Sequence, residues 1–207
     1  KEKISLVAID GYRLSVRSCI NKNNLDYDKC IISSKSLNDI NSLLPNSNDL
    51  VEIEFDDKYC LFKFEDIKII ARTLEGEFVD YKKLLPKEYS TKIKINKNEI
   101  VDSLERASLL SQMQKSNLIK LSIREDILLI TSNSDKGSIY EEVKINLEGE
   151  LLDIAFNSRY LIEGIKNIES EEITIEFTTN VNPCIVKPVD NIDYTYLLLP
   201  VRISLSI

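Results

Sequence analysis

The chain has 207 residues, of which 43% are hydrophobic, and its 27 basic and 34 acidic residues give a net charge of −7. This length and apolar content are enough for one or two buried cores. No histidine is present, which excludes histidine bases, Ser-His-Asp triads and histidine-ligated metals within the chain. The five glycines are scattered, so there is neither a phosphate-binding loop nor a dinucleotide fingerprint. We expect no metal and no cofactor.

The cysteines and the apolar segments indicate the cellular compartment in which the protein resides. Cys19, Cys30, Cys60 and Cys184 have no CxxC spacing, which is typical of reduced structural thiols. No apolar run approaches the roughly 18 residues of a membrane helix, and no signal peptide begins the sequence. We therefore expect a cytoplasmic protein. Its acidic net charge argues only weakly against nucleic acid, because a basic inner face with an acidic exterior gives the same total.

The first ninety residues predict a hairpin, a helix and three strands. Residues 3–9 and 12–18 alternate around Asp10-Gly11, a strong hairpin signal. Residues 35–44 have helical apolar spacing, and Pro45 ends this helix. The strands are expected at 50–56, 59–65 and 67–73. Residues 75–90 have no clean period and are interpreted as an interdomain linker.

The rest of the chain predicts two helices among many strands. Asn96 caps a helix over 97–113, and Glu99 completes a capping-box pattern. Asn157 caps a second helix over 158–167. Strands are expected at 91–95, 118–123, 127–132, 138–145, 151–156, 172–178, 184–189 and 194–199. The predicted fold class is α+β, with helices on one face of antiparallel sheets.

Part of the sequence is repeated. Ser33–Phe55 and Asn157–Phe177 each have a polar cap, a short amphipathic helix, a polar turn and a strand ending Ile-Glu-Phe. Phe55 and Phe177 are 122 residues apart (177 − 55), and Ala8 falls opposite Ile130 in the same register. This period exceeds the roughly 20–50 residues of solenoid repeats and indicates duplicated domains. If the second copy begins near Lys92, the first would begin about thirty residues before Lys1. We predict a partial domain over 1–90 and a complete one over 91–207.

Four motifs carry a resemblance to a known family. They are Asp10-Gly11-Tyr12-Arg13-Leu14, then Glu75 to Tyr81 running into Leu85-Pro86, then Phe156 to Leu161, and finally Leu199-Pro200-Val201-Arg202. In this order and spacing they resemble the bacterial sliding clamp, the beta subunit of DNA polymerase III. That clamp is built from repeated domains of one fold, in agreement with the 122-residue offset. The resemblance implies the back of the middle domain followed by the whole last domain.

The resemblance also implies a function. In this family two subunits close head to tail into a homodimeric ring around double-stranded DNA. The ring catalyses nothing and raises the effective concentration of polymerase at its template. The implied partners are duplex DNA, the alpha subunit of DNA polymerase III, the clamp loader and other proteins with a clamp-binding motif.

The family's binding site is a hydrophobic groove for short partner peptides, between the middle and last domains. Carried over by position, it comprises Gly11, Tyr12, Arg13, Leu14, Val79, Lys83, Leu84, Val181, Pro183, Leu197, Leu198, Leu199, Pro200, Val201 and Arg202. Leu14, Leu84 and Leu199 are expected to form the pocket, with Arg13 and Arg202 as ligands for carbonyls or a carboxylate. On sequence alone, Leu197, Leu198 and Leu199 are interpreted as core residues of the final strand.

Two further surfaces follow from the resemblance. The helices that line the ring correspond to 35–44, 97–113 and 158–167, and their DNA-facing candidates are Lys35, Lys97, Arg106, Arg159 and Lys166. A solvated helix face explains these charges equally well. Leu109 and Leu110 match the apolar contact that closes the ring, although the domain they would meet is not in this sequence.

Two alternatives are left open. One is an enzyme with Asp10 or the paired Glu141-Glu142 as catalytic carboxylates, although no metal set or nucleophile accompanies them. The other is a clamp-like interaction module that binds partner peptides without closing a ring on DNA.

Overall fold

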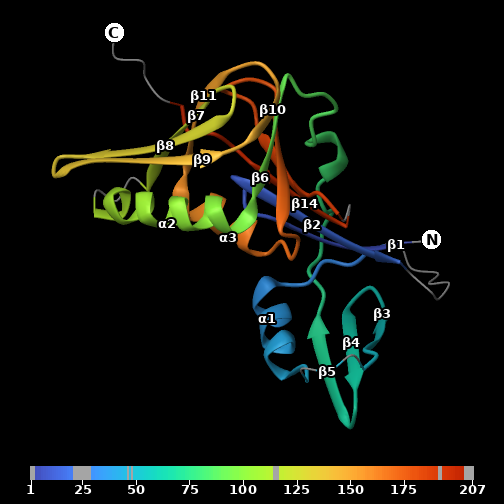
Figure 1. Ribbon diagram of the computed structural model, residues 1–207. Helices are drawn as coiled ribbons and strands as arrows, with labels where there is room; N and C mark the ends of the chain where they lie inside the picture. Colours follow the sequence, from blue (N-terminus) through green and yellow to red (C-terminus); the bar gives the residue numbers. More distant parts are fainter. Residues whose placement is uncertain are drawn as a thin grey trace. The chain divides into compact units, whose positions relative to one another are not determined.

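The computed structural model describes residues 3–20, 29–45, 47, 49–113, 117–190 and 193–202. These form two compact units, one within residues 29–80 and the other combining residues 3–20 with 81–202 (Figure 1). The second unit therefore contains both the beginning and the end of the described chain.

The smaller unit is a helix packed on a three-stranded antiparallel sheet. Helix α1 (Ser34–Leu43) begins at Ser33, whose hydroxyl accepts the backbone N–H of Ser36 at 3.0 Å. The sheet has the order β3-β4-β5, with bounds Glu52–Phe55, Tyr59–Phe64 and Ile67–Arg72. Alternation along β4 turns Cys60 and Phe62 toward Ile40 of α1, and these residues form a small core.

The larger unit has a seven-stranded antiparallel sheet. Its order is β1-β2-β14-β13-β12-β6-β10, with bounds Lys3–Ile9, Arg13–Ile20, Tyr194–Leu198, Cys184–Pro188, Glu172–Phe177, Thr91–Asn96 and Asn146–Gly149. The β1–β2 hairpin turns at Gly11, whose φ of +86° suits a residue without a Cβ. Strand β2 then pairs with β14, so the hairpin at the start of the described chain extends the same sheet as the strands near its end.

A second sheet and two helices complete this unit. The sheet has the order β11-β7-β8-β9, with bounds Leu152–Asn157, Leu118–Ile123, Ile127–Ser134 and Gly137–Lys144. Helices α2 (Lys97–Met113) and α3 (Ser158–Lys166) run beside each other below it (Figure 1). Leu104 of α2, Leu161 of α3, Leu121 of β7 and Ile175 of β12 share one buried core, so both sheets and both helices form a single body.

A short segment covers another part of the seven-stranded sheet. The 3₁₀ turn η1 (Tyr81–Lys83) interrupts the predicted linker over 75–90. Tyr81 and Leu85 pack against a second small core that includes Leu14 and Leu197. The segment therefore packs onto residues of the predicted binding site.

The predicted α+β fold class is confirmed, and each predicted helix and strand is present. Both predicted asparagine caps form: Asn96 Oδ1 accepts the N–H groups of Asn98 and Glu99, and Asn157 accepts that of Tyr160. Strand β10 was missed, because its four residues include Gly149 and owe their conformation to pairing with β6. In the described part of the chain, no helix has the length and apolar character needed to cross a membrane.

Candidate functional site

Backbone pairing brings three distant segments to one end of the seven-stranded sheet. Leu14 of β2 lies opposite Leu197 of β14, and Leu198 of β14 lies opposite Cys184 of β13. One residue beyond β14, the Leu199 N–H donates to the Tyr12 carbonyl at 2.9 Å. The hairpin tip, the start of β13 and the end of β14 therefore meet as the predicted groove requires.

The predicted groove residues divide into buried and exposed groups. Leu14, Leu197 and Leu198 are buried, with Leu14 only 1% exposed beneath Tyr81 and Leu85. Leu14 and Leu197 form an apolar floor that presents almost no surface to a ligand, whereas Leu198 turns to the opposite face of the sheet and joins the main core. We call four of the exposed apolar groove residues, Tyr12, Leu84, Val181 and Leu199, the apolar rim. Tyr12 is 61% exposed and Leu199 38%, enough for both to gain from being covered by a partner.

The other predicted groove residues surround this rim or lie apart from it. Gly11, Lys83, Val201 and Arg202 are exposed, and Pro183 and Pro200 are half-buried. The Val201 N–H donates to the Ala155 carbonyl at 2.8 Å, which attaches the terminal run to β11. Val79 is exposed but belongs to the smaller unit.

Arg13 is held by two carboxylates rather than left open for a ligand. Its Nε donates to Asp10 Oδ2 at 2.8 Å, and its Nη1 donates to Glu163 Oε2 at 2.5 Å. The guanidinium carbon also lies 4.4 Å from the centroid of the Tyr160 ring. Binding a carbonyl or a carboxylate, as the sequence suggested for Arg13, would therefore require exchange with one of these partners.

These contacts stabilise the charged forms. The pKa of Glu163 is lowered by hydrogen bonds from Arg13 first and from Arg159 second. Partial burial works to raise the pKa of Asp10, yet hydrogen bonds from Arg13 and from the Tyr12 N–H lower it overall. These contacts form a cluster of two carboxylates and two guanidiniums: Asp10, Arg13, Glu163 and Arg159. All four groups are ionised at neutral pH, so the cluster has two charges of each sign.

The predicted DNA-facing residues of the larger unit all have protein partners. Arg106 donates to both carboxylate oxygens of Glu141, at 2.9 and 2.6 Å. Arg159 pairs with Glu163 at 2.8 Å, and Lys166 pairs with Glu105. Lys97 donates to the Ile168 carbonyl at 2.9 Å. Lys35 is exposed on α1 of the smaller unit.

The exposed face of α2 is not a basic stripe. It carries Glu99, Asp102 and Glu105 beside Arg106. A phosphate approaching these helices must therefore compete with neighbouring carboxylates, and any such contact will be sensitive to salt.

The predicted ring contact lies on the exposed side of α2. Leu109 is 65% exposed and Leu110 is half-buried. In the described part of the fold, β9 is the last strand of its sheet, and α2 packs against it. An exposed leucine and a sheet edge thus lie on neighbouring elements, a combination typical of interfaces.

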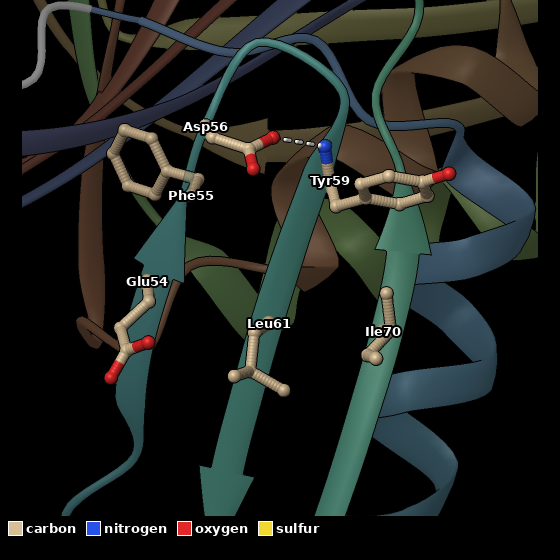
Figure 2. Close-up of a pocket in the computed structure, with 6 residues that line it drawn as sticks. All are labelled: Glu54, Phe55, Asp56, Tyr59, Leu61 and Ile70. Carbon is tan, nitrogen blue, oxygen red and sulfur yellow. Dashed lines mark hydrogen bonds between the residues drawn. The ribbon is translucent and has the colours of Figure 1, made fainter.

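The smaller unit has a separate surface hollow of about 400 Å³. Figure 2 shows Tyr59, Leu61 and Ile70 beside one another on adjacent strands, with Glu54 on the third strand. Asp56 accepts the Tyr59 N–H at 2.7 Å and closes the turn above them (Figure 2). None of the residues predicted to form the binding site lines this hollow. The outward alternation of apolar residues in β4 is the sequence signal that would have found it.

Two carboxylates of the alternative enzyme hypothesis, Asp10 and Glu141, are engaged in ion pairs. The pKa of Glu141 is lowered, chiefly by the hydrogen bond from Arg106, and that of Asp10 is lowered as described above. A lowered pKa disfavours proton transfer near neutral pH, so neither side chain has the character of a general acid or base. Among the described residues, no group of three or more Cys, Asp or Glu side chains is placed to hold a metal ion.

The comparisons with known proteins agree on one family. Residues 82–202 match the C-terminal domain of the DNA polymerase III beta subunit, and residues 1–80 match its central domain. The Beta sliding clamp of Staphylococcus epidermidis is 35% identical over 197 residues, which cover 94% of this chain and 52% of that protein. This chain thus spans about half the length of the curated relatives it matches.

Solved structures have the same fold. The DNA polymerase sliding clamp from Bacillus subtilis is 29% identical with a TM-score of 0.94, over 98% of this chain and 55% of that one. The DNA polymerase III beta subunit from Thermotoga maritima is 30% identical with a TM-score of 0.91, over 99% of this chain and 56% of that one. The similarity therefore covers both compact units.

Proposed function

Because this chain belongs to the DNA polymerase III beta subunit family, the bacterial sliding clamps, we propose that it serves as a processivity factor without catalytic activity. Residues 1–90 would be part of the middle clamp domain with its linker, and 91–207 the last domain. The proposed place of action is the cytoplasm. The proposed partners are double-stranded DNA, the alpha subunit of DNA polymerase III, the clamp loader and other proteins with a clamp-binding motif.

The observation that carries the proposal is the apolar rim above a buried apolar floor. Tyr12, Val181 and Leu199 come from segments far apart in the sequence and are exposed at the ends of neighbouring strands. An extended peptide with leucine or phenylalanine side chains gains by covering such a surface, and nearby backbone groups can fix its direction. Recognition of this kind tethers a partner without chemistry.

Ring closure and DNA contact form the second part of the proposal. In the sequence repeat, the β1–β2 hairpin corresponds to β8–β9, and β2 extends its sheet by pairing with β14. By the same geometry, the edge of β9 with Leu109 and Leu110 would receive a strand of another subunit in a homodimeric ring. Lys97, Arg106, Arg159 and Lys166, with Lys35 from α1, would contact phosphates without reading sequence.

A second candidate function is a clamp-like module that binds peptides without encircling DNA. It is favoured by the carboxylate partners of Arg106, Arg159 and Lys166 and by the acidic residues on α2. These lower the positive potential that a ring needs around DNA. DNA and peptide titrations of the same preparation separate the two candidates.

The peptide site is tested by fluorescence anisotropy with a labelled pentapeptide of the Gln-Leu-x-Leu-Phe type. We expect saturable binding by the wild-type chain, weakened roughly tenfold or more by Leu199→Asp, because the rim then presents a charge where an apolar side chain must be buried. The matched control is Leu151→Asp, a similarly exposed leucine outside the predicted groove. Equal losses in both variants, or no binding by a folded wild-type chain, would contradict the proposal.

A further inference from the structure

Glu163 of α3 is shared between two arginines. Its Oε2 accepts from Arg13 of the groove hairpin at 2.5 Å, and its Oε1 accepts from Arg159, one helical turn earlier, at 2.8 Å. One carboxylate thus connects a residue of the proposed peptide site with a residue of the proposed DNA-facing helix. The two arginines are 146 positions apart in sequence (159 − 13).

The peptide side of this link reaches the apolar rim through short contacts. Arg13 holds Asp10, whose other oxygen accepts the N–H groups of Tyr12 and Arg13 at 3.1 and 3.2 Å. Tyr12 in turn accepts the N–H of Leu199, and its ring lies 6.1 Å from that of Tyr160. Two rim residues, Tyr12 and Leu199, are therefore positioned by a turn that Glu163 helps to hold through Arg13.

The DNA side of the link is open to solvent. The Arg159 side chain is 71% exposed, whereas that of Arg13 is 27% exposed. An incoming phosphate can therefore reach Arg159 directly and compete with Glu163 for its guanidinium. Arg13 is more enclosed and is also held by Asp10 and the Tyr160 ring.

We propose that Glu163 is a positioning residue that couples DNA contact on α3 to partner-peptide binding at the apolar rim. The inference rests on the proposed function, because it needs both ligands. When a phosphate takes Arg159, Glu163 is left to Arg13 alone, and the Arg13–Asp10 turn becomes better ordered. A better-ordered rim loses less freedom when a peptide binds, so DNA strengthens peptide binding. Reciprocity requires the peptide to strengthen DNA binding by the same factor.

The test measures both affinities of the full chain, each with and without the other ligand. The probes are the labelled pentapeptide and a short blunt duplex of arbitrary sequence at low salt. For the wild-type chain we expect duplex to tighten peptide binding by roughly two- to fivefold, the range set by exposed ion pairs. For Glu163→Gln we expect no coupling, weaker peptide binding and tighter DNA binding, because Arg159 is released for phosphate.

In Glu163→Gln the peptide affinity and the DNA affinity are expected to change in opposite directions, which distinguishes a positioning role from a loss of folded structure. A variant that had lost part of its fold would bind both ligands less well. The matched control is Glu169→Gln, which removes another carboxylate paired with a β2 arginine, Arg17 at 3.3 Å. It makes the same change in net charge but has no contact with Arg159 among the described interactions, so it should keep the coupling.

Each possible result supports or overturns the proposed coupling through Glu163. Opposite shifts and lost coupling in Glu163→Gln, with coupling kept in Glu169→Gln, support the inference. Binding of both ligands without coupling in the wild-type chain, or the same behaviour in both variants, overturns the inference and leaves the proposed function standing. A folded wild-type chain that binds no duplex, or no peptide, overturns the inference together with that half of the proposed function.

Discussion

Gly164 of α3 lies against the Tyr196 ring of β14. A Cβ built on Gly164 would lie 2.2 Å from Cε1 and 2.4 Å from Cδ1 of the Tyr196 ring. The ring cannot swing away easily, because it is buried and its hydroxyl donates to the Tyr160 carbonyl at 2.8 Å. Alanine normally improves a helix interior by about 1 kcal/mol, but here the steric clash outweighs this gain.

Gly164→Ala should therefore lower the free energy of unfolding by roughly 1–3 kcal/mol, measured by urea denaturation followed by circular dichroism. The control combines Gly164→Ala with Tyr196→Leu, which removes the ring that the new methyl group would meet. When Tyr196→Leu is already present, the additional cost of the alanine should be small. An equal cost with and without Tyr196→Leu would mean that the close approach of α3 to β14 is not the cause.

At the residue scale, the sequence did not reveal which side chains are buried or which charged residues pair with each other. The family motifs pointed to the hairpin tip and to the end of β14, and backbone pairing places these two segments side by side. They did not distinguish Leu14, which is buried, from Leu199, which is exposed, because both are leucines within predicted strands. Nor did they identify Glu163 as the partner of Arg13, since the two are 150 residues apart. Such contacts depend on tertiary packing rather than on local pattern.

At the scale of single elements, the stability of α2 depends on the capping of its first turn. Asn96 Oδ1 accepts two N–H groups that the helix cannot satisfy itself, from Asn98 at 2.9 Å and Glu99 at 3.1 Å. Asn96→Ala should therefore cost about 1 kcal/mol of unfolding free energy, measured by urea denaturation. The control Asn98→Ala changes an exposed side chain in the same turn and should stay within about 0.5 kcal/mol of wild type. Equal effects of the two substitutions would contradict the capping role.

Local signals predicted most elements, because their causes are local. The caps of α2 and α3, the alternation in β4 and the turn at Gly11 are all determined by residues within a few positions of each other. Strand β10 escaped because it is defined by its partner β6 and not by its own residues. The pairing of β2 with β14 escaped for the same reason, since no local feature of either strand specifies a neighbour about 180 residues away.

At the scale of the whole molecule, cooperativity should follow the compact units rather than the order of the sequence. The smaller unit has the small core around Ile40, Cys60, Phe62 and Ala71, whereas the larger core extends over two sheets and two helices. Opening of the smaller unit should therefore require less free energy. The β1–β2 hairpin precedes the smaller unit in sequence, but its backbone hydrogen bonds are made with the larger one.

Native-state hydrogen exchange read by mass spectrometry can test this division. With increasing denaturant, we expect amides of β3, β4 and β5 to lose protection first, while those of β2 keep it together with β14. The reason is structural: β2 pairs with β14 from Arg13 to Arg17, and the Ser18 N–H donates to the Asp193 carbonyl at 2.8 Å. Strand β1 lies at the edge of the sheet, so its amides that are not hydrogen-bonded exchange without any unfolding. Their exchange serves as the internal reference for amides exposed in the native state. If β2 exchanged with β3–β5 instead, the floor of the proposed peptide site would open with the smaller unit. Peptide affinity would then depend on the stability of that unit, and a destabilising change in its core such as Phe62→Ala would weaken binding.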